Sequence, residues 1–357
     1  MAPFPHTFLP VPVCAALLLF AAGVHAAPPP PAPAEGTLRV ATWNVENLFD
    51  AEDDPDNPGD DEYTPGSWRR WTEERYQAKT RNLATSIAAL RPDVLFLAEV
   101  ENLAVLTNLV RALSELSEPF EMPYIAHRES GSTRGIDVAI LSRHPLRDVV
   151  LHTPVPHMRG ILEATATIGG TDATFYACHW KSWIGNAEEN IATRQKEAAA
   201  VRELVLKRLS ADPDAVLFVG GDFNDNCDGA SLRLGLHATV LRAELADVAE
   251  GPVLYNMVGD IPETERGSYY YARRKVWNTF DGIVVPPAML RAPGEAGPAW
   301  RLSTATPHAG VYKPDQGTDE DGRPKPFRRV RKKDGTDEFM DGCSDHFPLW
   351  VDFQRVR

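Results

Sequence analysis

Five apolar segments of the sequence end in side chains that can bind metal ions or transfer protons. The segments contain TWNVEN, LFLAEV, ACHWKS, GGDFN and CSDHFP, and a sixth motif, NTFDGIVV, begins its apolar segment with Asp281. Their carboxylate, amide and imidazole groups are Asn44, Glu46, Glu99, His179, Asp222, Asn224, Asp345 and His346. Each of these alone is more often a solvated edge or part of a turn. The same pattern at five places predicts one shared site, because strand ends can converge on one rim of a fold.

Metal-assisted hydrolysis is the chemistry that this set of side chains suits. Oxygen ligands such as Glu99, Asn44 and Asp345 favour Mg²⁺ or Mn²⁺, with Ca²⁺ as a further candidate. Asp222 can orient or deprotonate a water molecule, and an imidazole held by Asp281 can donate to a phosphate oxygen. The chain has no G-x-S-x-G elbow and no G-x-x-x-x-G-K-[ST] phosphate loop, which disfavours serine hydrolases and P-loop nucleotide triphosphatases.

The stretch GGDFNDNCDG could also be a calcium loop of the EF-hand kind. Such a loop starting at Asp222 needs Gly at position 227 and Glu at 233, where the chain has Cys and Arg. Starting at Asn224 puts Gly235 where the bidentate Glu should be. We therefore assign Asp222 and Asn224 to catalysis and residues 225–229 to a turn. The acidic loop 50–62 is expected to be solvated, with weak calcium binding as the alternative.

The elements that position these groups alternate between strands and helices. Apolar β-branched runs predict strands at residues 37–49, 93–100, 135–143, 148–153, 161–168, 173–180, 214–224, 277–286 and 344–353. Apolar residues at helical spacing predict helices at 67–90, 102–116 and 188–209. This order predicts an α/β fold, a mixed-sheet sandwich with helices outside rather than a doubly wound parallel sheet.

The N-terminal residues 1–27 have the features of a signal peptide. An apolar run too short for a comfortable membrane span precedes small residues at a cleavage position near Ala26. We expect a Pro-rich flexible leader at 28–36, one catalytic domain at 37–357, and a secreted or periplasmic protein without stable membrane association. The net charge of -13 means that any polyanion must be held by a local basic patch or by metal ions.

These motifs resemble the endonuclease/exonuclease/phosphatase superfamily, which has a deoxyribonuclease I-like fold. The matching strings are TWNVENL, DVLFLAEV, GIDVAILSR, HWKS, GGDFND, NTFDGIVV and SDHFPLWV, which run from Thr42 to Val351. The motifs TWNVENLFD and HWKS are most similar to those of secreted bacterial members described as extracellular nucleases. The resemblance implies a four-layer α/β sandwich in which two mixed sheets face each other.

The resemblance also implies a role for each matching residue. Glu99 would be the main metal ligand, with Asn44 and Asp345 close to the metal. His179 would contact the scissile phosphate, Asp222 would activate or align water, and Asn224 would hold a phosphate oxygen. Asp281 would orient His346, the general acid/base partner or transition-state stabiliser. Glu46 has no firm counterpart and is left as a supporting residue.

Three accessory features concern contacts to the substrate, and two of them have an alternative interpretation. Arg134 and Lys181 lie beside catalytic-type motifs and are predicted to contact phosphate. The basic tract 323–333, within a charged insert at 290–341, can be a phosphate-binding arm or a solvated segment. The stretch GSYYYARRKVW can stack on nucleobases or pack in the core.

The cysteines lead to a further prediction. Cys227 and Cys343 lie on loops at the same rim and in an exported protein, so we predict a disulfide between them. Cys178 lies in a strand and is predicted to be a buried thiol.

The leading hypothesis is a monomeric, secreted, metal-dependent phosphodiesterase that acts as a nuclease on DNA or RNA. The alternative is a phosphatase or a phospholipid phosphodiesterase on the same fold. A catalytically inactive binding module is disfavoured, because every expected catalytic position holds a competent residue.

Overall fold

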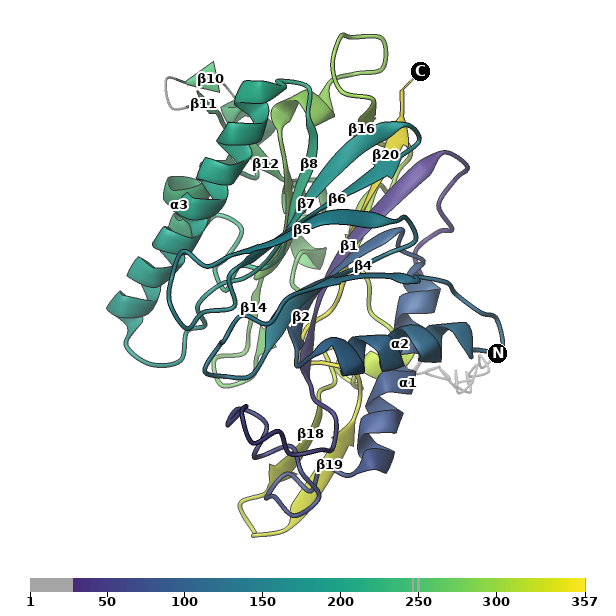
Figure 1. Ribbon diagram of the computed structural model, residues 1–357, viewed down its shortest axis with the longest axis vertical. Coiled ribbons are helices and arrows are strands. Elements are labelled where there is room, and N and C mark those ends of the chain that lie inside the picture. The colour runs from purple at the N-terminus through teal and green to yellow at the C-terminus, as the bar shows by residue number, and fades with distance from the viewer. Residues whose placement is uncertain (1–27, 246, 249–250, 357) are drawn as a thin grey trace, which may run out of the picture.

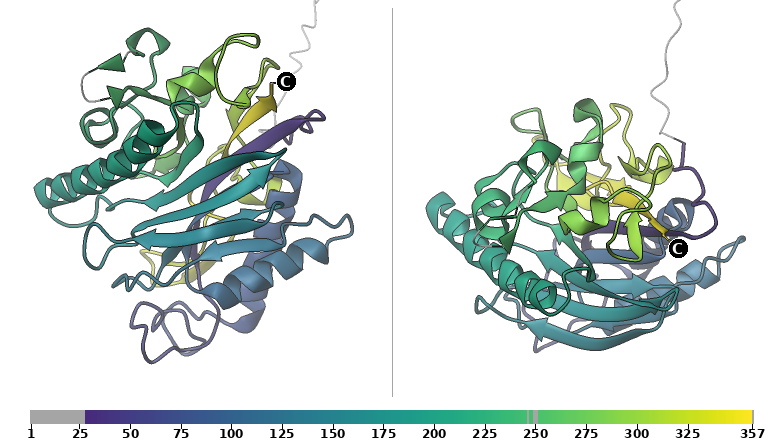
Figure 2. Two further views of the ribbon diagram at one scale, coloured as in Figure 1. Left: turned by 45° about the horizontal axis from the view of Figure 1, so that its top comes forward. Right: turned by 90° about the horizontal axis from the view of Figure 1, so that it is seen from above.

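Two mixed β-sheets pack face to face, and helices cover the outer face of each sheet (Figures 1 and 2). The computed structural model describes residues 28–245, 247–248 and 251–356 of the 357-residue chain. The predicted signal peptide, residues 1–27, lies outside the described residues. None of the helices in the described ranges combines the length and the apolar character that crossing a bilayer requires.

The first sheet holds the strands from both ends of the described chain, and the second sheet holds the middle of it. In order across the first sheet, the strands are β16 (Trp300–Leu302), β20 (Leu349–Arg355), β1 (Thr37–Leu48), β2 (Val94–Val100), β4 (Asp137–Ser142) and β3 (Tyr124–His127), with β17 (Ala309–Val311) also paired to β20. In order across the second sheet, they are β5 (Leu146–His152), β6 (Ile161–Ile168), β7 (Thr171–His179), β8 (Val216–Asp222), β15 (Asp281–Val285), β12 (Leu254–Asn256) and β9 (Ala238–Thr239).

Helices and two-stranded ribbons complete the molecule. The α-helices are α1 (Glu73–Leu90), α2 (Leu103–Ser114) and α3 (Ala187–Ala211). The ribbons are β10 (Asp247–Val248) with β11 (Gly251–Pro252), β13 (Tyr269–Tyr271) with β14 (Val276–Asn278), and β18 (Phe327–Arg331) with β19 (Asp337–Asp341).

The central strands carry apolar side chains on both faces, and another layer of the structure covers each face. Val40 of β1 and Phe218 of β8 point into the core between the two sheets. Their neighbours Ala41 and Leu217 point the other way, Ala41 toward α1 and α2 and Leu217 toward α3. The result is three apolar layers between four structural layers, which confirms the predicted four-layer α/β sandwich.

Some predicted boundaries were wrong for local reasons. The helix expected from residue 67 begins at Glu73, because the Thr72 side chain accepts the backbone N–H of Arg75 and caps it there. The strand expected at 277–286 divides into β14 and β15, which belong to different sheets. The last strand begins only at Leu349, so residues 344–348 form a loop before it.

The charged insert at 290–341 is structured. Its strands β16 and β17 extend the first sheet beside β20, while β18 and β19 form a hairpin. This hairpin lies beside the loop that precedes α1, at the lower end of the molecule in Figure 1. The rings of Trp71 in that loop and Phe327 in β18 make an edge contact at 5.7 Å. The insert therefore reaches the end of the molecule where β1 and β2 terminate.

Candidate active site

The ends of five strands, three in the second sheet and two in the first, bring the predicted catalytic residues together. In the second sheet His179 of β7 is in register with Asp222 of β8, and Asp222 is in register with Asp281 of β15. The antiparallel pairing of β8 and β15 puts Asp281 on the same rim, as predicted. In the first sheet Asn44 of β1 lies beside the end of β2, where Glu99 follows.

Asn44 joins the two sheets at this rim. Its Nδ2 donates to Glu99 Oε1 at 3.1 Å and to Asp222 Oδ2 at 3.0 Å. The other oxygen of Glu99 accepts the backbone N–H of Asn47 at 2.9 Å. His179 Nε2 lies 3.9 Å from Glu99 Oε1 and 3.7 Å from Asp222 Oδ2. Residues from both sheets therefore face one small volume.

The backbone at this rim adopts an uncommon conformation. Glu46, Asn47, Glu99 and Asn224 all have positive φ angles, between 47° and 65°. Non-glycine residues rarely adopt this region, and such residues cluster at functional sites. Here they turn the chain at the ends of β1, β2 and β8, and so aim the carboxylates inward.

Asp281 and His346 form a buried pair. His346 Nδ1 lies 2.7 Å from Asp281 Oδ2, and the imidazole Nε2 faces Asp222 Oδ2 at 3.9 Å and Asp345 Oδ1 at 4.0 Å. Burial lowers the pKa of His346, but the Asp281 and Asp222 carboxylates outweigh burial and hold this pKa well above its ordinary value. His346 is therefore an imidazolium at neutral pH.

His179 has the opposite protonation state. Burial and the nearby Arg159 guanidinium hold the pKa of His179 well below its ordinary value. Arg159 is itself buried and donates to the backbone carbonyls of His179 and Trp180 at 3.2 and 2.6 Å. His179 is therefore a neutral imidazole next to the carboxylates.

Asp222 lies between the two histidines. Burial raises the pKa of Asp222 to about 7, against the opposing effect of His346. The backbone N–H of Asn224 donates to Asp222 Oδ1 at 2.8 Å and fixes the carboxyl group. A carboxyl group with a pKa near neutrality is suited to accept a proton from water.

The other three predicted contacts to phosphate differ in position. Arg134 is exposed, and its guanidinium donates to Asn47 Oδ1 at 3.0 Å, which places it next to Glu99. Lys181 instead donates from Nζ to the carbonyl of Ile184 in its own loop at 3.3 Å. The Asn224 side-chain amide donates one N–H to the carbonyl of Trp180 at 3.0 Å, and its second N–H can still donate to a phosphate oxygen.

Glu46 is more central than the sequence indicated. Its Oε2 accepts the backbone N–H of Phe327 at 2.8 Å, and its Oε1 lies 3.2 Å from the Arg328 guanidinium. Arg328 also lies 3.5 Å from Asp345, so it bridges two carboxylates. Burial, with a contribution from Asp345, raises the pKa of Glu46 to about 7. Lys79 of α1, fully buried, donates to the Glu46 carbonyl.

Sequence reasoning missed these partners for different reasons. The basic tract before SDHFP was noticed, but nothing in it singled out Arg328. Lys79 could have been found as a charged residue on the apolar face of α1, between Tyr76 and Leu83. Arg159 carries no such signal, because it precedes β6 in an ordinary loop.

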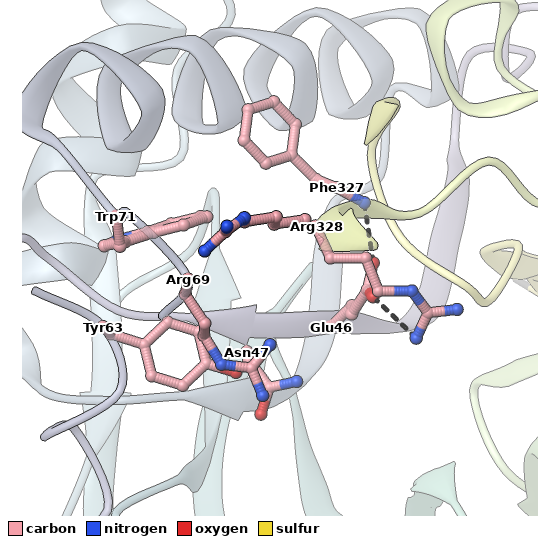
Figure 3. Close-up of a pocket in the computed structure, with 8 residues that line it drawn as sticks. Glu46, Asn47, Tyr63, Arg69, Trp71, Phe327 and Arg328 are labelled. Atoms are coloured by element: carbon pink, nitrogen blue, oxygen red, sulfur yellow. Dashed lines mark hydrogen bonds and ion pairs between the residues drawn. The ribbon is translucent and has the colours of Figure 1, made fainter. Parts of the chain in front are cut away.

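A pocket beside Glu46 is lined by arginines and aromatic rings (Figure 3). Its lining residues are Glu46, Asn47, Tyr63, Arg69, Trp71, Phe327, Arg328 and Arg329. The Arg69 guanidinium lies over the Tyr63 ring at 4.6 Å, and Tyr63 stacks on Phe49 at 4.0 Å. The loop before α1 and the hairpin β18–β19 thus form a wall of arginines and aromatic rings next to Glu46, in which each arginine is paired with a carboxylate.

The donor set at the rim fits a hard divalent cation. Glu46, Glu99, Asp222 and Asp345 supply carboxylate oxygens. Asn44 turns its Nδ2 toward Glu99 and Asp222 while its Oδ1 accepts the Glu46 backbone N–H, so this amide would have to rotate to offer its oxygen to a metal ion. Oxygen ligands suit Mg²⁺, Mn²⁺ or Ca²⁺. Arg328 is the guanidinium that bridges two of these carboxylates, Glu46 and Asp345. The residues present therefore match the predicted metal site in chemistry.

The predicted disulfide was wrong. Cys178, Cys227 and Cys343 are all free and buried. Cys227 belongs to the core between the sheets, whereas Cys343 packs against Ser86 of α1 on the outer side of the first sheet. A β-sheet layer therefore separates the two thiols. Cys178 is the buried thiol that was predicted.

Comparison with known proteins agrees with this geometry. A model of the endonuclease/exonuclease/phosphatase family matches residues 39–355. No curated protein matches the chain in sequence. Members of the matching family hydrolyse phosphate esters and depend on divalent metal ions.

Solved structures of the same fold cover nearly the whole chain. Truncated TDP2 from Caenorhabditis elegans is 15% identical with a TM-score of 0.51, over 89% of this chain and 97% of that one. A family protein from Bacteroides thetaiotaomicron is 16% identical with a TM-score of 0.51, over 90% and 98%. Beta toxin from Staphylococcus aureus is 15% identical with a TM-score of 0.52, over 88% and 99%. These structures share the fold. The family model covers residues 39–355, so the chain belongs to the endonuclease/exonuclease/phosphatase family, and it is a hydrolase of phosphate ester bonds.

Proposed function

We propose that this hydrolase is a secreted phosphodiesterase that acts as a nuclease on DNA or RNA, by metal-assisted in-line attack of water. The observation that carries the proposal is a pair of surfaces next to the carboxylates. One is the arginine-lined pocket, and the other is a row of aromatic rings that leads to His346. Nucleic acid needs both phosphate contacts and stacking surfaces.

The aromatic row begins at the surface and ends at the catalytic histidine. Trp183 is 51% exposed, and its ring lies 5.5 Å from that of Phe280. Phe280 stacks on Tyr269 at 5.3 Å, and Tyr269 lies 4.8 Å from the His346 ring. An exposed tryptophan at the outer end of this row offers a face on which a nucleobase can stack.

Glu99, Asn44 and Asp345 would hold the metal, with Glu46 adjacent. A divalent ion held there would supply positive charge against the phosphate and would lower the pKa of water. Asp222 accepts the proton of the attacking water, as its pKa of about 7 allows. His346, kept charged by Asp281, stabilises the negative charge that develops on the phosphate, and neutral His179 donates a hydrogen bond to a phosphate oxygen.

A phospholipid phosphodiesterase is the second candidate. Ile184, next to Trp183, is 74% exposed, so the outer end of the aromatic row is also an apolar tip. An exposed apolar tip beside a phosphodiesterase site could contact a lipid surface. We also propose that residues 1–27 direct export and that the mature protein is monomeric.

A product assay tests the proposal. The mature protein with Mg²⁺ should cleave duplex DNA, single-stranded DNA or RNA faster than sphingomyelin or a phosphomonoester, and EDTA should abolish the activity. His346→Gln should reduce the rate about 10²–10³-fold, because it removes the positive charge that stabilises the negative charge developing on the phosphate. His308→Gln is a matched control, because His308 pairs with Asp260 at 2.9 Å near the opposite end of β20. Faster hydrolysis of sphingomyelin than of every nucleic acid would contradict the nuclease assignment.

A further inference from the structure

The loop between β1 and α1 holds a cluster of carboxylates apart from the catalytic site. Asp53, Asp60 and Asp61 each place an oxygen within 4.8 Å of the oxygens of the other two. The arginine of this loop that lines the pocket of Figure 3, Arg69, pairs with Glu62 instead. Three carboxylates at this separation repel one another unless a cation lies between them.

Asp60 is the buried member of the cluster, and one of its carboxylate oxygens lacks a hydrogen-bond partner. It is 0% exposed, and its Oδ2 accepts the backbone N–H of Asp54 at 2.8 Å. Its Oδ1 is buried and has no hydrogen-bond partner. Buried carboxylates are normally paired or bound to metal, because burial of an unpaired charge is costly. Asp60 therefore presents an unsatisfied buried oxygen within the cluster.

The surroundings of the loop are also acidic. A cleft of about 550 Å³ next to the cluster is lined by Asp54, Asp56, Glu101, Glu129 and Asp137, together with backbone and uncharged residues. Glu101 accepts the backbone N–H of Asp50 at 2.9 Å and so ties the loop to the end of β2. A cleft with one sign of charge raises the local concentration of counter-ions.

We propose that Asp53, Asp60 and Asp61 bind a Ca²⁺ ion that is separate from the catalytic metal and that fixes the loop from Asp50 to Tyr63. The donors are oxygens only, which excludes a preference for zinc. The loop is irregular, and Ca²⁺ accepts six to eight oxygen ligands in flexible geometry, whereas Mg²⁺ demands a near-ideal octahedron. Water and loop carbonyls would complete the coordination.

The position of this loop affects the substrate side of the active site. A Cβ atom on Gly59 would lie 2.3 Å from the Arg134 carbonyl oxygen, and a Cβ atom on Gly135 would lie 2.0 Å from Asn57 Oδ1. The loop is therefore in close contact with the turn that carries Arg134. Tyr63, whose N–H donates to the Asp60 carbonyl, lines the pocket of Figure 3. The ion would thus act as a positioning element for Arg134 and Tyr63.

Cation binding can be measured without substrate, so its result is independent of the proposed function. Glu99→Gln protein, in which the catalytic metal site is weakened, is titrated with Ca²⁺ and with Tb³⁺, whose luminescence Tyr63 and Trp71 would sensitise. We expect one saturable site, a rise in the melting temperature with Ca²⁺, and weaker binding of Mg²⁺. Adding Asp60→Asn should weaken Ca²⁺ binding at least about tenfold and remove the thermal shift, because it removes a charged ligand.

A double variant at exposed positions separates loss of Ca²⁺ binding from misfolding caused by changing the buried Asp60. Asp53 and Asp61 are exposed, so Asp53→Asn with Asp61→Asn leaves the core intact and should also weaken binding at least about tenfold. Glu52→Gln, an exposed loop position outside the cluster, should bind Ca²⁺ like its parent. Absence of a saturable site in Glu99→Gln, or unchanged affinity in the double variant, would overturn the proposal. Equal affinity for Mg²⁺ would overturn the assignment to Ca²⁺.

Discussion

Two buried histidines in this site hold opposite protonation states because their neighbours differ. His346 faces Asp281 and Asp222, whose charges outweigh the effect of burial on its pKa. His179 is buried next to the Arg159 guanidinium, which adds to the effect of burial in the opposite direction. One fold can therefore supply a charged and a neutral imidazole at the same pH.

Replacing Asp281 by Asn tests this difference. The pKa of His346 is raised in wild type, so an activity that needs the imidazolium is retained until the pH rises through that high pKa. Asn cannot supply the charge, so the pKa of His346 should fall and the loss of activity at alkaline pH should begin at a lower pH. The measurement is the pH profile of kcat/KM at saturating Mg²⁺. An unchanged alkaline limb would show that Asp281 does not control His346.

At the residue scale, the sequence predicted the groups on the strands and missed those held by long-range contacts. His179, Asp222 and Asp281 occupy adjacent register positions, so strand ends alone were enough to place them together. The bridge from Arg328 to Glu46 joins residues far apart in the chain, and no local pattern encodes it. The disulfide was predicted from nearness to one rim, which ignored the sheet between the two thiols.

At the scale of elements, the hairpin β18–β19 brings charge of opposite sign to the carboxylate rim. Arg328 in β18 bridges Glu46 and Asp345, whereas Arg331 at the end of the same strand is exposed. Substrate phosphate carries the same sign of charge as those carboxylates. We therefore expect Arg328 to exchange part of this bridge for the phosphate when substrate binds.

Arg328→Ala should raise KM for a nucleic acid substrate about tenfold or more with a smaller change in kcat, since a hydrogen bond to a charged group contributes about 1.5–3 kcal/mol. Steady-state kinetics at two salt concentrations give the separate constants. Arg331→Ala is the control on the same strand and should change KM by less than Arg328→Ala does. A fall in kcat at unchanged KM would instead make Arg328 a positioning residue for Glu46 and Asp345.

The central elements were predictable because they are buried on both faces. The apolar runs of β2 and β8 leave no polar face, which identifies strands inside a layered fold. The ends of the elements were less predictable. The helix was predicted from residue 67, but the Thr72 side chain caps α1 and makes it begin at Glu73. The short strands of the insert gain their stability from β20, so their own sequences carry little signal.

At the scale of the whole molecule, the protein has a net charge of -13, and some of its carboxyl groups are buried. Glu197 of α3 is one that lies away from the predicted metal ligands. It is buried, its Oε2 accepts the Lys181 backbone N–H at 2.8 Å, and burial raises its pKa to about 7 despite the nearby Arg159. An acid with a raised pKa in the folded state binds its proton more tightly there than in the unfolded chain.

The stability contributed by protonated Glu197 is therefore present below the unfolded pKa of 4.5 and is lost as the pH rises through about 7. The loss is about 3 kcal/mol, because each pKa unit corresponds to about 1.4 kcal/mol. Gln at position 197 cannot ionise, so the variant should not lose this stability. Between pH 4 and 8 the unfolding free energy of wild type should therefore fall by about 3 kcal/mol relative to that of Glu197→Gln. Urea unfolding across this range measures it, with Glu203→Gln at an exposed position of the same helix as the control. Parallel curves for Glu197→Gln and wild type would contradict the prediction, since they would mean that ionising this buried carboxyl group carries no net cost.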